Sequence, residues 1–277
     1  MGVVDIEEEL RNEARKLLGD KRVDYVIGYE KAGGKISPCF IDNAGEVERL
    51  VWNPGCVHNL AVYLLEAKSE GKVAVVAKGC DVRAIIELIK QNQIERDKVF
   101  IIGISCDGVE DVSGEKYDKC RVCRYPTPLI YDVLLGGEKE GKEEDYSDVE
   151  QMGSLPPEER REFWKKQFSK CVRCYACRNI CPLCYCEHCA LEDEKWVSKS
   201  NEFPDIWMFH MIRAFHLAGR CIGCGECERA CPVNIPLMKL YRKIEKDVRE
   251  LFGYEAGVNW DDIPPLASFD VDKDKEK

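Results

Sequence analysis

The sequence predicts an α/β N-terminal domain with a parallel βαβ unit, followed by a second, cysteine-rich domain. Two continuous apolar runs, 72–77 and 98–104, flank a segment with helical periodicity, 81–94. Strands that are buried on both faces have this uninterrupted apolar character, and a strand, helix and strand of these lengths form a right-handed unit with parallel strands. Most of the 17 cysteines among the 277 residues lie in the second half of the chain, which indicates a different kind of domain there.

Short elements are expected before this unit. Residues 4–19 have the periodicity of an amphipathic helix, and residues 57–67 form another helical stretch after a break at Asn53-Pro54-Gly55. Three stretches are expected as strands: 23–27, 36–41 and 47–52. The pair Gly33-Gly34 predicts the turn between the first two of them.

The composition of the chain changes midway. Residues 136–148 are rich in glycine and charge and show no apolar period. We therefore expect a linker over 136–157, between a first domain, 1–135, and a second, 158–268. The charged residues 269–277 are expected to be a disordered tail. Helices are expected in the second domain at 156–171, 203–217 and 237–252.

Eight cysteines of the second domain form two repeats of the pattern C-x2-C-x2-C-x3-C, each followed by proline. The repeats are Cys171, Cys174, Cys177 and Cys181, then Cys221, Cys224, Cys227 and Cys231. A four-iron cluster needs four thiolates around it, and three closely spaced cysteines on a tight loop supply one side. The pattern is typical of bacterial two-cluster ferredoxins, so an α+β ferredoxin-like dicluster domain with added helices is expected.

The fourth cysteine of each repeat is expected to bind the cluster of the other repeat, as in two-cluster ferredoxins. One 4Fe-4S cluster is assigned to Cys171, Cys174, Cys177 and Cys231, and the other to Cys221, Cys224, Cys227 and Cys181. Gly223 and Gly225 allow the backbone to approach the second cluster closely. Zinc is the alternative, but zinc sites usually show two separated C-x2-C pairs.

Three more cysteines follow the first repeat directly: Cys184, Cys186 and Cys189. Their density indicates an additional metal site, completed by His188 or by a remote cysteine, and the alternative is spare thiols near the cluster. His210 and His216 are expected on a face of the helix over 203–217, although histidine replaces cysteine in some clusters.

The first domain holds a second concentration of cysteines. Four of them are Cys80 and Cys106, which follow the two parallel strands, and the C-x2-C pair Cys120 and Cys123. Parallel strands end at one edge of a sheet, where α/β proteins bind ligands. These cysteines can therefore converge on a third metal site, and a further iron–sulfur cluster is expected there. The helix N-terminus is expected to favour the Cys80 thiolate. Cys56 is a competing ligand, and Cys39 is expected to be a buried, inert thiol.

The charge and the termini restrict the kinds of partner. The formal net charge of −10 disfavours nonspecific binding to nucleic acid and to anionic membranes. The first residues are acidic and lack the features of a signal peptide, and no run of about 18 apolar residues predicts a membrane span. A cysteine-rich chain of this kind favours metal binding over disulfides, so a cytoplasmic protein of an anaerobic organism is expected.

Two stretches resemble known families. VAVVAKGCDVRAIIEL, followed by VFIIGISCDGV, resembles the coenzyme F-420 hydrogenase/dehydrogenase beta-subunit family over residues 71–109. This resemblance implies an α/β flavin-binding region, joined to ferredoxin clusters, that exchanges electrons between a flavin or deazaflavin and a partner subunit. FHLAGRCIGCGECERACP, within residues 170–237, is similar to the iron–sulfur subunits of heterodisulfide reductase, formate dehydrogenase and aldehyde oxidoreductase complexes.

The expected function is that of an iron–sulfur electron-transfer subunit. It relays electrons between a catalytic redox partner and a carrier such as ferredoxin, through two or more 4Fe-4S clusters. No catalytic triad, acid–base pair or phosphate loop is evident, which favours a non-catalytic role. The alternative is a flavin-dependent catalytic subunit that acts on a nicotinamide or deazaflavin coenzyme, although no G-x-G-x-x-G fingerprint supports it. A third hypothesis is a zinc-stabilised interaction module.

Overall fold

The computed structural model describes residues 5–66 and 71–265 and divides the chain into two compact units, 1–144 and 145–277. Each unit is described by itself. The predicted tail, 269–277, lies outside the described residues, as do the first residue of the helix predicted over 4–19 and the last residue of the helical stretch 57–67.

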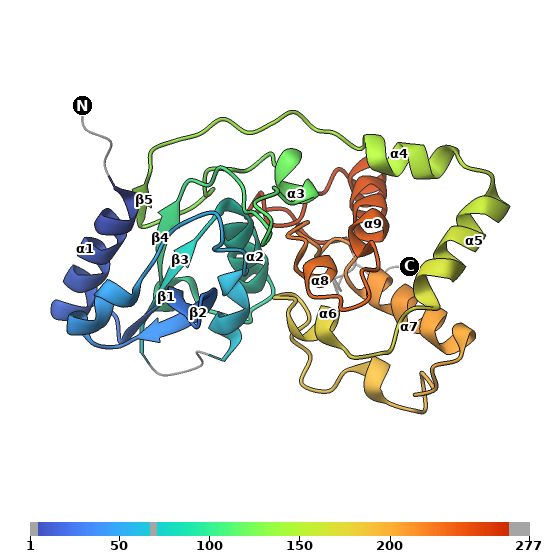
Figure 1. The fold of residues 1–277 in the computed structure, drawn as a ribbon, viewed down its shortest axis with the longest axis horizontal. Coiled ribbons are helices and arrows are strands. Elements are labelled where there is room, and N and C mark those ends of the chain that lie inside the picture. Colours follow the sequence, from blue (N-terminus) through green and yellow to red (C-terminus); the bar gives the residue numbers. More distant parts are fainter. Residues whose placement is uncertain (1–4, 67–70, 266–277) are drawn as a thin grey trace, which may run out of the picture. The chain divides into compact units, whose positions relative to one another are not determined.

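A five-stranded sheet with the strand order β2-β1-β3-β4-β5 forms the centre of the first unit (Figure 1). The strands are β1 (Tyr25–Ala32), β2 (Lys35–Ile41), β3 (Val73–Ala77), β4 (Val99–Ile104) and β5 (Val133–Leu135). Neighbours among β1, β3, β4 and β5 are parallel, and β2 pairs antiparallel with β1. Helix α2 (Gly79–Lys90) joins β3 to β4, so the predicted parallel βαβ unit is confirmed.

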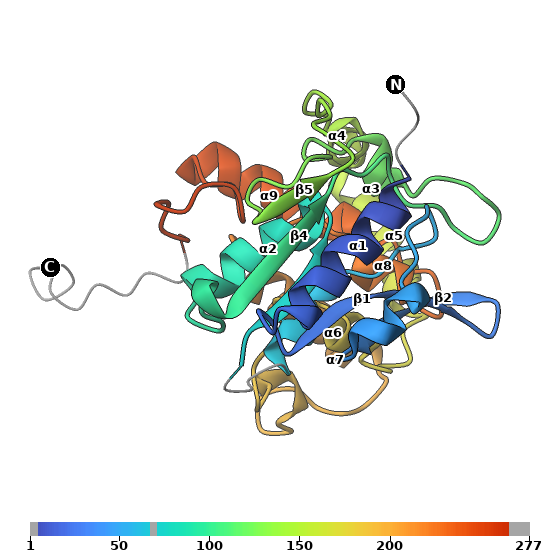
Figure 2. The same cartoon turned by 90° about the vertical axis from the view of Figure 1, so that its left-hand side faces the viewer.

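Helices α1 (Ile6–Gly19) and α2 lie on opposite sides of this sheet, as Figures 1 and 2 show. Every residue of β3 and β4 is buried, because a sheet covered on both faces leaves no side for polar residues. Asp5 accepts a hydrogen bond from the amide of Glu7 at 3.0 Å and so caps α1. The core of this unit therefore consists of two apolar layers, one on each face of the sheet.

Several predicted elements of the first unit are wrong in type or length. The strand expected over 47–52 is instead the 3-10 helix η1 (Ala44–Arg49), which begins where the Asn43 side chain accepts from the amide of Gly45 at 2.9 Å. The stretch 57–67 contains a second short 3-10 helix, η2 (Leu60–Leu65). Helix α2 ends at Lys90 rather than at residue 94, and Asn92 has the positive φ of 55° typical of a helix end.

Two short elements complete the first unit without having been predicted. These are the 3-10 helix η3 (Arg96–Lys98) and the helix α3 (Asp118–Arg121), which contains Cys120. Strand β5 was not predicted either. Three residues are too few for a recognisable period, and the pairing of β5 with the edge of β4 defines it.

The second unit contains helices and loops but no strand in its described residues, 145–265, so the expected α+β character is not seen there. Its helices are α4 (Ser147–Ser154), α5 (Pro157–Phe168), α6 (Ala176–Asn179), the 3-10 helix η4 (Ala190–Glu192), α7 (Phe203–His216), α8 (Glu226–Arg229) and α9 (Leu237–Phe252). The three predicted helices correspond to α5, α7 and α9. Helix α4 lies within the residues expected to be a linker, 136–157, and packs against α9.

Candidate metal centres

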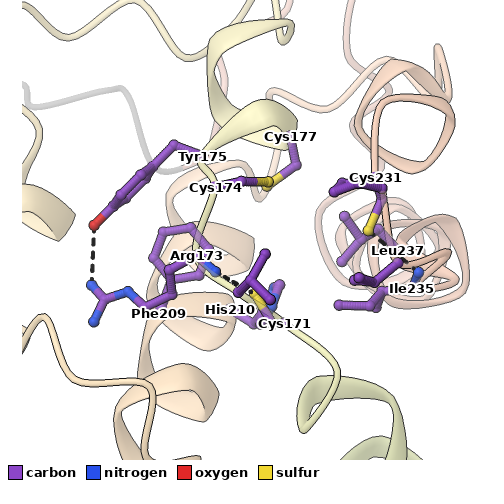
Figure 3. Close-up of a pocket in the computed structure, with 13 residues that line it drawn as sticks. Cys171, Arg173, Cys174, Tyr175, Cys177, Phe209, His210, Cys231, Ile235 and Leu237 are labelled. Atoms are coloured by element: carbon purple, nitrogen blue, oxygen red, sulfur yellow. Dashed lines mark hydrogen bonds between the residues drawn. The ribbon is translucent and has the colours of Figure 1, made fainter.

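The first cysteine loop starts where α5 ends and turns into α6. A recess with about 340 Å³ of empty space is lined by Cys171, Cys174 and Cys177 of this loop and by Cys231 of the second repeat. Figure 3 shows Cys231 entering from a different segment and facing the other three. The structure thus brings together the four cysteines predicted to share one cluster, including the one that crosses over.

A second recess of about 340 Å³ is lined by the other predicted set: Cys221, Cys224, Cys227 and Cys181. Cys181 comes from the first repeat, so the exchange of the fourth cysteine is reciprocal. The short helices α6 and α8, which carry the third cysteine of each repeat, contact one another. The two repeats are therefore packed against each other, and each completes the recess of its neighbour.

The backbone bends in the same way in both loops. In the second loop Gly223 and Gly225 have φ of 67° and 72°, and the corresponding residues of the first loop, Arg173 and Tyr175, have φ of 49° and 59°. This left-handed conformation is easy for glycine and costly for other residues. The loop shape is therefore kept even where the side chain opposes it.

Backbone amides point at several of the cysteine sulfurs. The amide of Arg173 donates to Cys171 Sγ at 3.4 Å, and the amide of Ile235 donates to Cys231 Sγ at 3.4 Å. The amide of Gly223 makes the equivalent bond to Cys221. Donors of this kind stabilise the thiolate form that binds iron. The donor set, with four convergent sulfurs and amides aimed at them, fits a thiolate-bound 4Fe-4S cluster in each recess.

A buried arginine lies beside both recesses. Arg213 of α7 is 2% exposed, donates from Nη2 to the carbonyl of Cys177 at 2.7 Å, and lines the second recess. Its Nη1 donates to the hydroxyl of Tyr241. None of the ion pairs found among the described residues provides Arg213 with a carboxylate partner. A buried charge without a counter-charge is costly, so this arginine fits recesses that hold anionic groups.

The pKa values of the surrounding thiols show the same electrostatics. Burial raises the pKa of Cys177, Cys221 and Cys227, to about 12 for Cys221, and the Arg213 charge opposes the rise in each case. A hydrogen bond with Cys184, followed by burial, raises the pKa of Cys181, and the same hydrogen bond lowers the pKa of Cys184 to about 6. Arg213 was not singled out from the sequence, although it occupies a position on the buried face of α7, seven residues after Ile206 and four after Phe209.

The two histidines of α7 have different surroundings. His210 is 1% exposed, lines the first recess and has no hydrogen-bond partner on either ring nitrogen. Burial lowers its pKa to about 3, with the charges of Arg213 and Arg173 adding to the effect. His216 is exposed. His210 is therefore an uncharged, buried ring beside the recess that holds Cys171.

The three cysteines after the first repeat are spread over different surroundings. Cys184 forms a side-chain hydrogen bond with Cys181, which lines the second recess. Cys189 is half-buried and packs against the apolar cluster of Leu191, Val197 and Phe209, whereas Cys186 is exposed. Across residues 5–66 and 71–265 no three His, Cys, Asp or Glu side chains form a group suited to one metal ion. The additional site at Cys184, Cys186 and Cys189 stays a prediction.

The cysteines of the first unit surround the carboxyl ends of β3 and β4. Cys106 interacts electrostatically with Cys80, Cys120, Cys123 and Cys56. The amide of Gly108 donates to Cys106 Sγ at 3.3 Å, and the amide of Val109 donates to Cys120 Sγ at 3.4 Å. A Cβ on Gly79 would lie 1.8 Å from the carbonyl oxygen of Tyr125, so only glycine lets the loop after Cys123 reach the start of α2. The predicted set therefore gathers at one edge of the sheet.

The pKa values of Cys80 and Lys78 describe the electrostatics at this edge of the sheet. Burial, followed by the carboxylate of Asp81, raises the pKa of Cys80 well above its usual value. Any preference of the helix N-terminus for the Cys80 thiolate is therefore outweighed by burial and by Asp81. Lys78, 2% exposed, donates from Nζ to the carbonyl of His58 at 2.8 Å and lies 3.1 Å from Asp81. Burial alone lowers the pKa of Lys78, but Asp81 and the thiols of Cys80 and Cys106 raise it above its usual value.

The two remaining thiols of the first unit are deeply buried. Burial raises the pKa of Cys39 to about 12 and that of Cys56 to about 11. Cys56 Sγ accepts from the amide of Asn53 at 3.4 Å. Cys39, which lies on β2, fits the prediction of an unreactive core thiol.

Comparisons with known proteins give similarities to an iron–sulfur binding domain and to two formate dehydrogenase subunits. A family model described as a 4Fe-4S binding domain matches residues 217–236. The chain is 28% identical to the F420-dependent formate dehydrogenase subunit beta of Methanocaldococcus jannaschii, over 90% of this chain and 91% of the relative. It is also 28% identical to the F420-dependent formate dehydrogenase 1 subunit beta of Methanococcus maripaludis, over 72% of this chain and 76% of the relative.

A further similarity covers a smaller part of the chain. The chain is 35% identical to NADH-quinone oxidoreductase subunit I 2 of Geobacter metallireducens, over 24% of this chain and 42% of the relative. No helix among the described residues is long and apolar enough to cross a membrane. The chain is therefore similar to F420-dependent formate dehydrogenase beta subunits over most of its length, and residues 217–236 match a 4Fe-4S binding domain.

Proposed function

We propose that this chain is an iron–sulfur electron-transfer subunit of an oxidoreductase complex, with two 4Fe-4S clusters in its second unit. The observation that carries the proposal is the pair of recesses, each lined by three cysteines of one repeat and the fourth of the other. One cluster is held by Cys171, Cys174, Cys177 and Cys231, and the other by Cys221, Cys224, Cys227 and Cys181. When bound, the clusters supply one-electron redox chemistry within a broad range of potentials.

The residues around the recesses have supporting roles in this proposal. Amides of Arg173, Gly223 and Ile235 donate to the cysteine sulfurs and orient them. Arg213 provides a buried positive charge beside both sets of thiolates, which favours the reduced, more negative state of each site. Phe209 and Ile235 line the first recess and restrict access of water to it.

A third cluster in the first unit is part of the proposal. Its ligands are Cys80, Cys106, Cys120 and Cys123, at the edge where β3 and β4 end. The electrostatic interactions among these thiols and the amide donors from Gly108 and Val109 support it. Cys56 is the competing ligand, because it also interacts with Cys106.

The partner proposed for this subunit is a catalytic subunit that oxidises formate. Two relatives that are formate dehydrogenase beta subunits support this choice. Electrons then leave toward a carrier, for which ferredoxin is the proposed class. Formate added to the reconstituted pair of subunits should bleach the cluster absorption, and no bleaching with an active catalytic subunit would argue against this partner.

A second function is a flavin-dependent subunit that reduces or oxidises a deazaflavin coenzyme. The observation in its favour is the F420 dependence stated in the names of the relatives. It predicts bound flavin after mild anaerobic purification, together with hydride transfer to F420. A protein that contains iron and sulfide, yet binds no flavin on reconstitution, would contradict this second function and support the first.

Metal analysis of anaerobically purified protein tests the cluster proposal directly. We expect about eight irons and eight sulfides per chain from two clusters, or about twelve of each with the third. The pair of substitutions Cys80→Ala and Cys123→Ala should lower twelve to about eight and leave the ferredoxin-type signals intact. Zinc without sulfide would contradict the whole proposal.

A further inference from the structure

The second unit contains a larger recess, of about 690 Å³, apart from the two cysteine-lined ones. Helices α4, α5, α7 and α9 supply its walls, and α4 packs on α9 while α5 packs on α7 (Figure 1). The side chains that matter for the argument are Arg160, Arg161, Lys239, Lys243, Trp164 and Trp207. We call this recess the tryptophan pocket. None of these residues has a role in holding the proposed clusters.

The tryptophan pocket is positively charged in an acidic chain. Four of its lining side chains are cationic and none is a carboxylate, whereas the chain carries a formal net charge of −10. Lys243 pairs with Asp247. Arg160 donates from Nη1 to the carbonyl of Gly153 at 3.4 Å, and in the part of the chain that the structure describes no ion pair involves Arg160, Arg161 or Lys239. Uncompensated cations around one recess favour an anionic occupant.

The aromatic side of the pocket leads toward the first cysteine recess. The rings of Trp164 and Trp207 both contact Phe168, with centroids 5.2 Å and 5.5 Å away. Phe168 in turn stacks on His210 at 4.3 Å, with an angle of 8° between the rings. His210 lines the recess of Cys171 and Cys231. A continuous series of aromatic contacts therefore joins the two sites.

We propose that the tryptophan pocket binds a phosphorylated planar aromatic compound, with its ring against Trp164 or Trp207 and its phosphate near Arg160, Arg161 and Lys239. The space that a ligand could occupy is about 280 Å³, just below the roughly 300–1,000 Å³ of small-molecule sites, which suits a compact ligand. Indole rings stack well on planar heterocycles, and arginine binds phosphate through two parallel hydrogen bonds. Binding at this site does not depend on the proposed clusters; only the aromatic route to the first recess gains its meaning from the proposed function.

Four probes separate the two parts of this chemistry in equilibrium dialysis with anaerobic, full-length protein. Flavin mononucleotide and adenosine monophosphate combine a ring with a phosphate, riboflavin has the ring alone, and pyrophosphate has the charge alone. We expect at least one of the first two to bind about tenfold more tightly than both single-feature probes. Preference for the flavin mononucleotide identifies a flavin-type ligand, and preference for adenosine monophosphate a nucleotide. If neither flavin mononucleotide nor adenosine monophosphate binds more tightly than riboflavin and pyrophosphate, the proposal is overturned.

Charge-reversal variants locate the binding in the pocket. Arg161→Glu and Lys239→Glu should each weaken binding of the preferred probe by about three- to tenfold, because each removes one contact with the phosphate. The matched control is Lys166→Glu, on the same helix as Arg161, at an exposed position outside the pocket. A control as damaging as the pocket variants overturns the assignment. Iron and sulfide contents measured on the same samples report separately on the proposed clusters.

Discussion

The two cysteine loops of the second unit have the same backbone bends but different residues at them. Gly223 and Gly225 adopt left-handed φ at almost no cost, whereas Arg173 and Tyr175 adopt it at a cost of about 1–2 kcal/mol each. In the first loop the Arg173 guanidinium donates to the carbonyls of Ser198 and Ser200. These bonds offset the strain. The comparison shows that the sulfur positions require this backbone, because the first loop keeps it without glycine.

The loops also differ in exposure. Cys174 of the first loop is exposed, whereas the corresponding Cys224 of the second is 8% exposed. A redox centre near the surface exchanges electrons with a partner more readily than a covered one. We therefore expect the first cluster to face the outside and the second to be better protected from solvent oxidants.

The largest expected effect comes from testing the crossing of the fourth cysteines. The double variant Cys181→Ala with Cys224→Ala removes two ligands of one cluster, so a second-unit iron content of about four should remain. The double variant Cys181→Ala with Cys174→Ala damages both clusters and should leave almost none. Iron, sulfide and paramagnetic resonance measurements distinguish the two. Reversed results would mean that each repeat binds its own cluster and that the crossing is wrong.

Removal of the charge at Arg213 should affect both loops at once. Arg213→Met is expected to lower both reduction potentials by on the order of 50–100 mV, because a buried positive charge stabilises the added electron. Potentiometric titration followed by paramagnetic resonance measures the shift. Arg213→Lys keeps the charge and serves as the control. Equal shifts in the two variants would point to disturbed packing rather than to charge.

A smaller effect is expected from exchanging the residue types between the loops. Gly223→Ala places a Cβ 3.5 Å from Glu245 Oε2, an ordinary contact, at a φ of 67°. The strain should cost about 1–2 kcal/mol, which corresponds to an apparent melting temperature lower by roughly 2–6 °C in anaerobic scans. Arg173→Gly relieves strain yet loses the carbonyl bonds of the side chain. A gain in melting temperature for Arg173→Gly would show that these bonds do not offset the strain.

The smallest effect on iron content is expected from substituting a cysteine outside both loops. This variant is the reference for the cysteine substitutions within the loops. Cys39→Ala should leave the iron content unchanged. The pKa of Cys39 is about 12 in the folded protein and about 8.5 in an unfolded chain. Above pH 8.5 the unfolded chain releases this proton while the folded protein keeps it, so the free energy of unfolding falls as pH rises toward 12, by at most about 1.4 kcal/mol per pH unit.

The contribution of Cys39 to stability is therefore fully present below pH 8.5. The Cys39→Ala variant should lack this part of the alkaline loss, which denaturant titrations at pH 8 and pH 10.5 can measure. An unchanged pH dependence in the variant, or loss of iron, would contradict the assignment of Cys39 as an inert core thiol.

The sequence predicted those elements that are defined by residues within a short stretch of the chain. The βαβ unit around Val73–Ala77 and Val99–Ile104 was predicted because strands buried on both faces are apolar at every position. The two cysteine repeats were recognised for a similar reason, since the separation of ligands along a tight loop follows from the size of the cluster. These features can be recognised from the local residues alone, without knowledge of the rest of the chain.

Only the tertiary structure decided the features that depend on distant partners. Strand β5 has three residues and exists through its pairing with β4. Residues 44–49 form a 3-10 helix because the Asn43 side chain starts the turn, whereas a strand was expected over 47–52. Arg213 became important when folding buried it beside both cysteine sets. Sequence thus determined where the cysteines of the proposed sites lie along the chain. Packing determined which charges and rings surround them, since those neighbours are brought together only by the fold.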